Sequence, residues 1–204
     1  MQRSRPAPPS LPSRPTRTDA RRNYDSLVAA ADELFGERGT DVPLDDVVRR
    51  AGLGSGTLYR HFSSRDALMA AVFWGRIEAL CKEADRLLLA DSPVEGIVTW
   101  LRSLIGLTMR RGLAAALAAD NKDGGSELFR YCRQALDTAA TPLLRRAKED
   151  GAFHPDLEVS DLITFTHAIA VAAERAPDSE EHADRLLRML LDGLRTRDKP
   201  TARL

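Results

Sequence analysis

The sequence is poor in cysteine and in aromatic residues, and it has no long apolar run. Its 204 residues include two cysteines, Cys81 and Cys132, which are too few for a disulfide framework or a four-ligand zinc site. No stretch reaches the roughly 18 to 20 consecutive apolar residues that a membrane span needs. Residues 1–17 also lack the apolar centre of a secretion signal. These absences predict a cytoplasmic protein with reduced cysteines and no membrane contact.

Aromatic residues make up 5% of the sequence, whereas alanine and leucine recur throughout. This composition favours helices, because strands prefer β-branched and aromatic residues. Apolar residues also recur at the helical period, and Gly, Pro or Ser separates one periodic segment from the next. We therefore predict an all-α protein of about nine helices. Their expected ranges are 19–38, 43–51, 55–61, 64–90, 93–110, 113–119, 126–150, 158–175 and 180–196.

Residues with strong capping preferences stand at several of the expected helix ends. Ser63, with Asp66 three residues later, predicts a capping box for the helix at 64–90. Ser92 followed by proline is a typical N-cap for the next helix. Gly39 and Gly52 are predicted to end the first two helices, because glycine adopts the left-handed conformation common at helix C-termini.

Charge is balanced over the whole chain but unevenly distributed. The 30 Lys and Arg residues equal the 30 Asp and Glu residues, yet residues 1–65 carry 11 arginines against 8 acids. Six of these arginines lie within residues 1–22. A basic arm suits contact with a polyanion, although a solvated tail without a partner has the same composition.

Residues 44–68 are the most informative stretch, because two short amphipathic helices meet there at a tight turn. The turn, Ala51-Gly52-Leu53-Gly54, has the glycines typical of a helix-turn-helix. In this motif the second helix presents its N-terminal side chains to the major groove. Apolar spacing assigns Val47, Leu58 and Phe62 to the core. The residues left on the outer face are small or hydrogen-bonding: Ser55, Gly56, Thr57, Tyr59, Arg60 and His61.

Residues 51–68, AGLGSGTLYRHFSSRDAL, resemble the signature A-G-x-x-x-G-T-x-Y-x-H-F-x-x-[KR]-x-x-L of TetR-family transcriptional regulators. The resemblance implies an N-terminal three-helix helix-turn-helix DNA-binding domain and a C-terminal helical bundle for effector binding and dimerisation. Three parts are then expected: a disordered Arg/Pro-rich arm at 1–17, the DNA-binding domain at 18–65 and the effector-binding and dimerisation domain at 66–204.

The resemblance also implies roles for individual residues. Ser55, Gly56, Thr57 and His61 occupy groove-facing positions. Thr57, Tyr59 and Arg65 occupy phosphate-contacting positions, and Arg21 and Arg22 lie where the first helix reaches the DNA backbone. The chain departs from the family pattern at Pro43 and Leu44, where Ser or Thr commonly enters the second helix, and at Gly54, where a Ser cap is usual. Fewer side-chain contacts with phosphate are therefore expected.

Two further groups of apolar residues are expected to have functions in the larger domain. The last two expected helices carry more apolar surface than one bundle edge needs, and two copies would bury it in a symmetric interface. The proposed interface residues are Leu162, Phe165, Ile169, Leu187, Leu190 and Leu194. An effector pocket is suggested by Trp74, Ile77, Trp100, Leu104, Leu117, Phe129 and Cys132. If these residues enclose a cavity, it fits a flat, apolar effector; the plainer alternative is that they simply fill a core.

Two alternatives to an effector-controlled regulator remain at this point. One is an all-α enzyme or adaptor with an incidental helix-turn-helix, and the other is a regulator without an effector. His154, His167 and His182 have no metal-ligand spacing with one another or with the cysteines, so no catalytic residue, metal or cofactor is expected. The sequence favours a homodimeric repressor that binds palindromic double-stranded DNA and is released by a small apolar effector.

Overall fold

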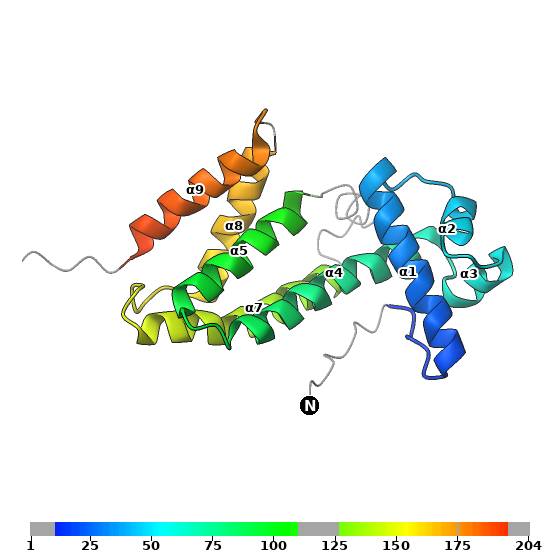
Figure 1. Cartoon of the computed structure of the whole chain (residues 1–204), viewed down its shortest axis with the longest axis horizontal. Coiled ribbons are helices and arrows are strands. Elements are labelled where there is room, and N and C mark those ends of the chain that lie inside the picture. The colour runs from blue at the N-terminus through cyan, green and yellow to red at the C-terminus, as the bar shows by residue number, and fades with distance from the viewer. Residues whose placement is uncertain (1–10, 110–126, 175, 196–204) are drawn as a thin grey trace, which may run out of the picture. The chain divides into compact units, whose positions relative to one another are not determined.

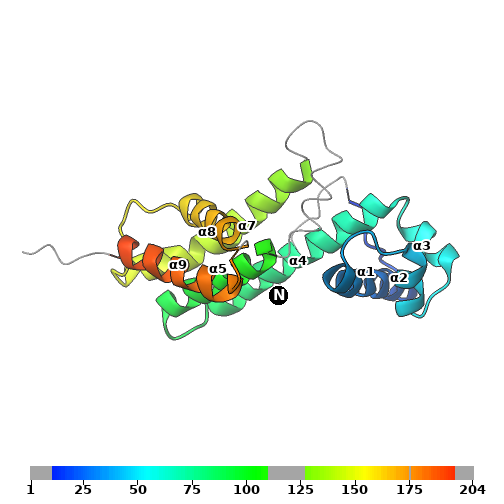
Figure 2. The same ribbon diagram turned by 90° about the horizontal axis from the view of Figure 1, so that it is seen from above.

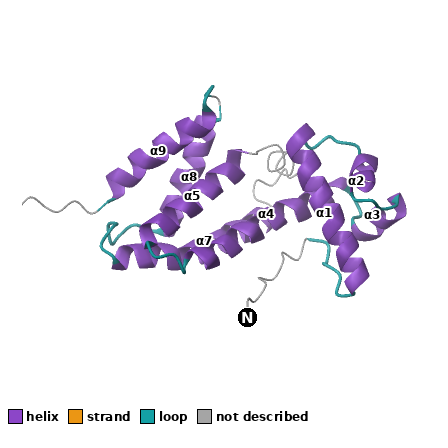
Figure 3. Ribbon diagram, in the orientation of Figure 1, coloured by secondary structure: helices purple, strands orange, loops and turns teal. Residues whose placement is uncertain are grey.

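The computed structural model describes residues 11–109, 127–174 and 176–195, and the regular elements in these ranges are helices (Figure 3). The predicted all-α class is confirmed. The helices are α1 (Thr18–Arg38), α2 (Leu44–Arg50), α3 (Ser55–His61), α4 (Arg65–Leu87), α5 (Pro93–Met109), α7 (Glu127–Glu149), α8 (Val159–Ala173) and α9 (Ser179–Leu194). The helix expected at 113–119 and the pocket residue Leu117 lie outside the described residues.

The chain forms two compact units. Unit 1 contains α1, α2, α3 and the start of α4, up to Ala79, together with α7 up to Ala135. Unit 2 contains the remainder of α4 and α7 together with α5, α8 and α9. Within the ranges that are described, no helix is both long enough and apolar enough to pass through a bilayer.

In unit 1, α1 packs against both α2 and α3 (Figure 1). The apolar positions of α1 recur at the helical period and turn inward, so that Leu27 and Leu34 are almost completely buried. Leu58 on α3 and Phe62, directly after α3, are buried as well, and the Phe62 ring lies 4.9 Å from that of Tyr24. This small core holds the two short helices in place, because helices of seven residues are not stable on their own.

In unit 2, α8 packs against both α5 and α9, and the three helices lie together in both views (Figures 1 and 2). Trp100 on α5 is fully buried, and its indole N–H donates to the carbonyl oxygen of Leu80 at 3.0 Å. Arg146 on α7 donates to the carbonyl oxygens of Leu88 and Ala90, just after the end of α4. These bonds satisfy carbonyls that a helix terminus leaves without partners.

The helix ends agree with the sequence signals at most positions. Ser92 accepts a hydrogen bond from the amide of Glu95 at 3.2 Å, as an N-cap should. The predicted capping box at Ser63 is wrong by one residue. Ser64 is the residue that caps α4, because its Oγ accepts from the amide of Ala67 at 3.1 Å.

Candidate nucleic-acid interface

The connection between α2 and α3 is a tight turn closed by backbone hydrogen bonds. The amide of Leu53 donates to the carbonyl oxygen of Val48 at 3.0 Å, and the amide of Gly52 donates to that of Arg49 at 3.2 Å. This pair of bonds is a Schellman motif, which needs a left-handed residue after the helix. Gly52 supplies it with φ +67°. These backbone bonds fix the turn, and the buried side chains Leu58 and Phe62 hold α3 against the core.

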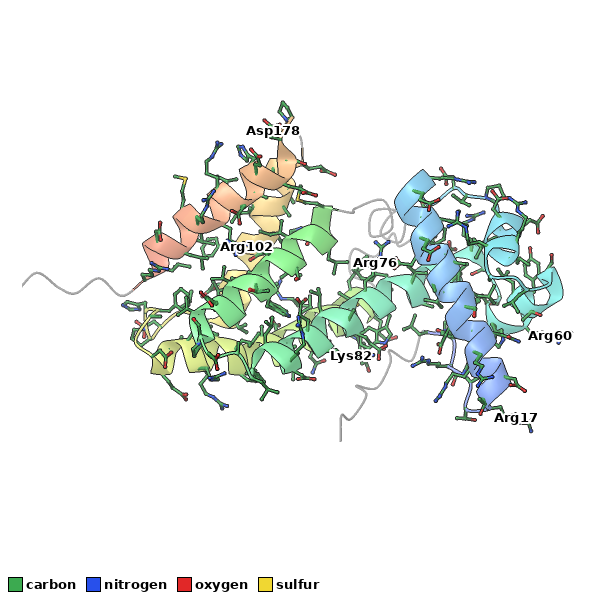
Figure 4. The ribbon with its side chains drawn as sticks, viewed as in Figure 1. Arg17, Arg60, Arg76, Lys82, Arg102 and Asp178 are labelled. Atoms are coloured by element: carbon green, nitrogen blue, oxygen red, sulfur yellow. The ribbon has the colours of Figure 1, made fainter. Side chains whose placement is uncertain are left out.

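Two faces of α3 have different environments. Leu58 and the following Phe62 point into the core and are 1% and 0% exposed. Tyr59 is 61% exposed even though it is a large aromatic residue, and Arg60 lies at the outer edge of α3 (Figure 4). The remaining residues of the predicted outer face are exposed or half-buried: Ser55, Gly56, Thr57 and His61. The structure thus brings the predicted recognition residues together on one short helix.

Gly56 has no packing partner that requires glycine. A Cβ built at this position meets nothing within 4 Å, and the same holds for Gly54 just before α3. Neither residue has a positive φ, so the backbone does not require glycine either. Close approach of another molecule is a physical reason for glycine at an open helical site.

Apart from Arg65, the described arginines before Ala79 fall into two groups. Arg14, Arg38, Arg49, Arg50 and Arg76 pair with aspartate or glutamate. Among the described residues, no acidic partner lies within ion-pair distance of four others: Arg17, Arg21, Arg22 and Arg60. These four are exposed and lie at the start of α1 and on α3. Cations without acidic partners beside a polar helix face form an electrostatic footprint suited to phosphate.

Two of the paired arginines, Arg38 and Arg50, join α1 to α2. Arg50 on α2 bonds to Glu33 at 3.0 Å and to Glu37 at 3.2 Å, both on α1. The hydrogen bond from Arg50 lowers the pKa of Glu37, and the bond with Glu37 raises the pKa of Arg50. Asp46 accepts from Arg38 at 3.1 Å and from Arg49 at 2.7 Å. These are exposed pairs, so each adds little to stability.

Arg65 has an environment that the sequence did not indicate. Its Nη1 donates to the carbonyl oxygens of Thr40 at 2.8 Å and Val42 at 2.7 Å, in the connection between α1 and α2. The guanidinium is therefore bonded to the protein itself, whereas the resemblance implied a contact with phosphate. A carbonyl partner more than 20 residues away gives no local signal in the sequence.

His61 and Tyr24 join the end of α3 to α1. Their rings meet edge to face with centroids 6.0 Å apart, and His61 is half-buried. Burial raises the pKa of the Tyr24 phenol. His61 therefore contributes to packing within unit 1, besides any role at the outer face.

The residues that precede α1 contact that helix. Leu11 is 9% exposed, and Arg14 forms two hydrogen bonds with Asp25, at 2.9 and 2.6 Å. The bond with Asp25 also raises the pKa of Arg14. Both residues belong to the arm that the sequence predicts to be disordered, whose residues 1–10 lie outside the described part. Charge counting alone could not identify the pair, because residues 1–17 contain four arginines.

The six expected interface residues of α8 and α9 are not equivalent. Leu162 and Leu187 have no exposed surface within the chain, because they pack inside the bundle of α5, α8 and α9. Direct contact with a second copy is thus excluded for these two. Phe165 is 45% exposed, and three others are half-buried: Ile169, Leu190 and Leu194. The sequence missed Val171 and Met189, which are exposed on the same two helices.

The expected pocket residues are nearly all buried. Trp74 and Ile77 on α4 and Cys132 on α7 belong to unit 1, together with Phe129, whose ring lies 5.5 Å from that of Phe73. Trp100 and Leu104 on α5 belong to unit 2 and are buried there. The pocket that they would line stays a prediction.

Comparison with known proteins agrees with this architecture. Residues 27–72 match the family described as bacterial regulatory proteins of the tetR family, and residues 92–196 match the C-terminal domain of SbtR-like transcriptional regulators. A TetR transcriptional regulator from Streptomyces coelicolor, solved by crystallography, is 35% identical with a TM-score of 0.70. The alignment covers 84% of this chain and 98% of that one.

Two curated proteins are also similar. The HTH-type transcriptional repressor KstR2 of Mycolicibacterium smegmatis is 26% identical over 77% of this chain and 78% of its own length. The HTH-type regulator YvdT of Bacillus subtilis is 40% identical, but the chain spans only 26% of that relative's length. The match to the C-terminal family covers about half of the chain, and the Streptomyces relative covers most of it. The chain therefore belongs to the TetR family of DNA-binding transcriptional regulators, a family of regulators and not of enzymes.

Proposed function

We propose that the protein is a repressor that binds a palindromic operator as a homodimer and is released by a small apolar effector. The observation that carries the DNA-binding part is the position of the arginines without acidic partners. Arg17, Arg21 and Arg22 at the start of α1 and Arg60 on α3 accompany the exposed polar face of α3. On this proposal, α3 reads base edges and the start of α1 holds phosphates.

The contacts with DNA follow from the side chains on α3. Thr57, Tyr59 and Ser55 offer hydroxyls, and Gly56 allows the backbone to come close to the groove. Arg60 and His61 add donors at the end of the helix, where they suit a phosphate or a guanine edge. Arg65 is proposed to act through the protein rather than directly, because its Nη1 already donates to two carbonyls.

A second copy of the chain is the proposed partner of α8 and α9. Between Asp161 and Glu174, α8 carries no acidic or basic residue apart from a histidine, and Phe165 and Val171 are exposed on it. Met189 on α9 is 66% exposed. An exposed apolar face on neighbouring helices suits a symmetric interface, and a dimer would place two α3 helices about 34–36 Å apart on the DNA.

The proposed effector is a small apolar molecule bound by the C-terminal domain. C-terminal domains of this kind typically bind ligands and dimerise. The buried residues Trp100 and Leu104 of unit 2 favour an apolar ligand over a charged one. A regulator controlled only by its own abundance remains as the alternative, and a ligand-induced loss of DNA binding would distinguish the two.

Selection of DNA by the purified protein tests the main proposal. The full chain is incubated with a random-sequence duplex library, and retained fragments are sequenced. We expect a palindromic consensus whose affinity falls steeply with salt, because binding releases counterions from phosphates. Retention without a consensus, or no retention at low salt, would refute operator binding.

The dimer has its own test. Met189→Glu places a charge on the exposed face of α9, and Leu190→Glu does the same at a half-buried site. Both should give monomers in light scattering and weak operator binding. Leu89→Glu is the matched control, since Leu89 is 85% exposed in the connection after α4. A folded Met189→Glu variant that stays dimeric would exclude this interface.

A further inference from the structure

Two arginines on α4 attach that helix to the elements that carry α3. Arg65, the first residue of α4, donates from Nη1 to the carbonyl oxygens of Thr40 and Val42. These carbonyls lie between the end of α1 and the start of α2. A side chain with two bonds to backbone acceptors is fixed in one orientation, so it joins the start of α4 directly to the start of the helix-turn-helix.

Arg76 makes the second attachment. Its Nε donates to Oδ1 of Asp32 on α1 at 2.6 Å, and its side chain is only 12% exposed. Beside it, α4 lies close to α1, because a Cβ built at Gly75 would be in ordinary van der Waals contact with Cγ1 of Val28, at 4.0 Å. The Asp32 side chain is 45% exposed, so only the arginine of this pair is shielded from solvent, whereas the arginines that pair on α2 are both exposed.

The spacing of the two arginines places both attachments on one face of α4. They are eleven residues apart, which is three helical turns, and about 16 Å along the axis at 1.5 Å per residue. One contact would leave α4 free to pivot against α1. Two contacts three turns apart fix its direction as well as its position. A change in the direction of this part of α4 would then move α1, α2 and α3 with it.

We propose that Arg65 and Arg76 are positioning residues, which set the orientation of α3 for operator binding without touching DNA themselves. This inference rests on the operator binding proposed above. It predicts a particular pattern of loss. Without either arginine, α3 keeps its side chains but loses a fixed orientation, so the variant discriminates poorly between DNA sequences. The phosphate contacts made from the start of α1 stay in place.

The test compares a duplex selected by the wild-type protein from a random library with a scrambled duplex of the same composition. Arg65→Ala and Arg76→Ala should each weaken binding to the selected duplex by about tenfold, within the range typical of coupling between sites. Binding to the scrambled duplex and the slope against salt should stay as in the wild type. A lost phosphate contact behaves differently: both duplexes are weakened, and the slope falls by about 1.

Reversal of the ion pair separates positioning from a general loss of stability. The double variant Asp32→Arg, Arg76→Asp restores a pair of opposite charges, so it should recover most of the preference that Arg76→Ala loses. Arg102→Ala is the control, because it breaks an exposed pair with Asp184 in unit 2. If Arg76→Ala unfolds, Arg76→Met replaces it, because methionine fills similar space but has no donor for Asp32.

The outcomes are distinct. If the wild-type protein retains no consensus sequence from the random library, the proposed function itself is refuted. Wild-type preference in the Arg76 variants, or no recovery on charge reversal, refutes the positioning role of Arg76. If Arg65→Ala instead loses affinity equally for both duplexes and shows a smaller dependence of affinity on salt, Arg65 is a phosphate contact, and its positioning role is overturned.

Discussion

Substitution of Gly56 by alanine separates the stability of α3 from its proposed contact with DNA. A Cβ at this position meets nothing within 4 Å, and its φ is not positive. The methyl group therefore costs the folded protein nothing. Alanine is favoured over glycine in a helix by about 0.5–1 kcal/mol. For a chain of this size, such a gain raises Tm by roughly 1–4 °C.

The same methyl group should weaken operator binding. If the backbone of α3 approaches the bases at Gly56, the extra carbon overpacks a close contact, at a cost of about 1–3 kcal/mol. Affinity for the selected duplex would fall by roughly 5-fold to 150-fold. Fluorescence anisotropy with labelled duplex gives the affinity, and a thermal melt followed by circular dichroism gives the stability of the same sample.

Gly36→Ala provides the matched control. Gly36 is an exposed helical glycine on α1, and a Cβ there also meets nothing within 4 Å. It should raise Tm similarly and leave DNA binding unchanged. The reasoning fails if Gly56→Ala binds the operator as the wild type does. A fall in Tm would also contradict the reasoning, because it would mean that the added methyl group clashes with a neighbour in the folded protein.

Three further predictions concern single side chains. Tyr59→Phe should leave Tm unchanged, since the residue is 61% exposed, but weaken operator binding by several-fold; equal binding by anisotropy would exclude a role for the hydroxyl. Trp100→Ala should cost about 3–5 kcal/mol in urea unfolding if this buried residue fills a core, and much less if it lines a pocket. Glu37→Gln should make folding stability depend less on pH in the acid range. Arg50 holds the folded-state pKa of Glu37 below its ordinary value, so its contribution is present at neutral pH and lost as pH falls through that pKa; identical acid melts would refute this.

The sequence was sufficient for the helices but not for every contact between them. Gly52 ends α2 as predicted, and α3 has the predicted bounds, because glycine and apolar period are local signals. The cap of α4 was misplaced by one residue, since Ser63 and Ser64 are chemically identical and only geometry distinguishes them. Periodicity also could not show which apolar residues of the last two helices face inward, and Leu162 proved to be buried.

On α3, the residues that pack in the core are different from those that are exposed. This difference bears on how the DNA sequence recognised by the protein can change. Leu58 and Phe62 hold the helix, whereas Ser55, Gly56 and Arg60 are exposed. Exposed substitutions usually change stability by no more than about 0.5 kcal/mol. If these exposed residues contact the operator as proposed, a duplicated gene could change its operator through substitutions that each leave the protein folded. Libraries randomised at these three positions should likewise yield mostly folded proteins. Regulators that do not bind one another's operators could be selected from them.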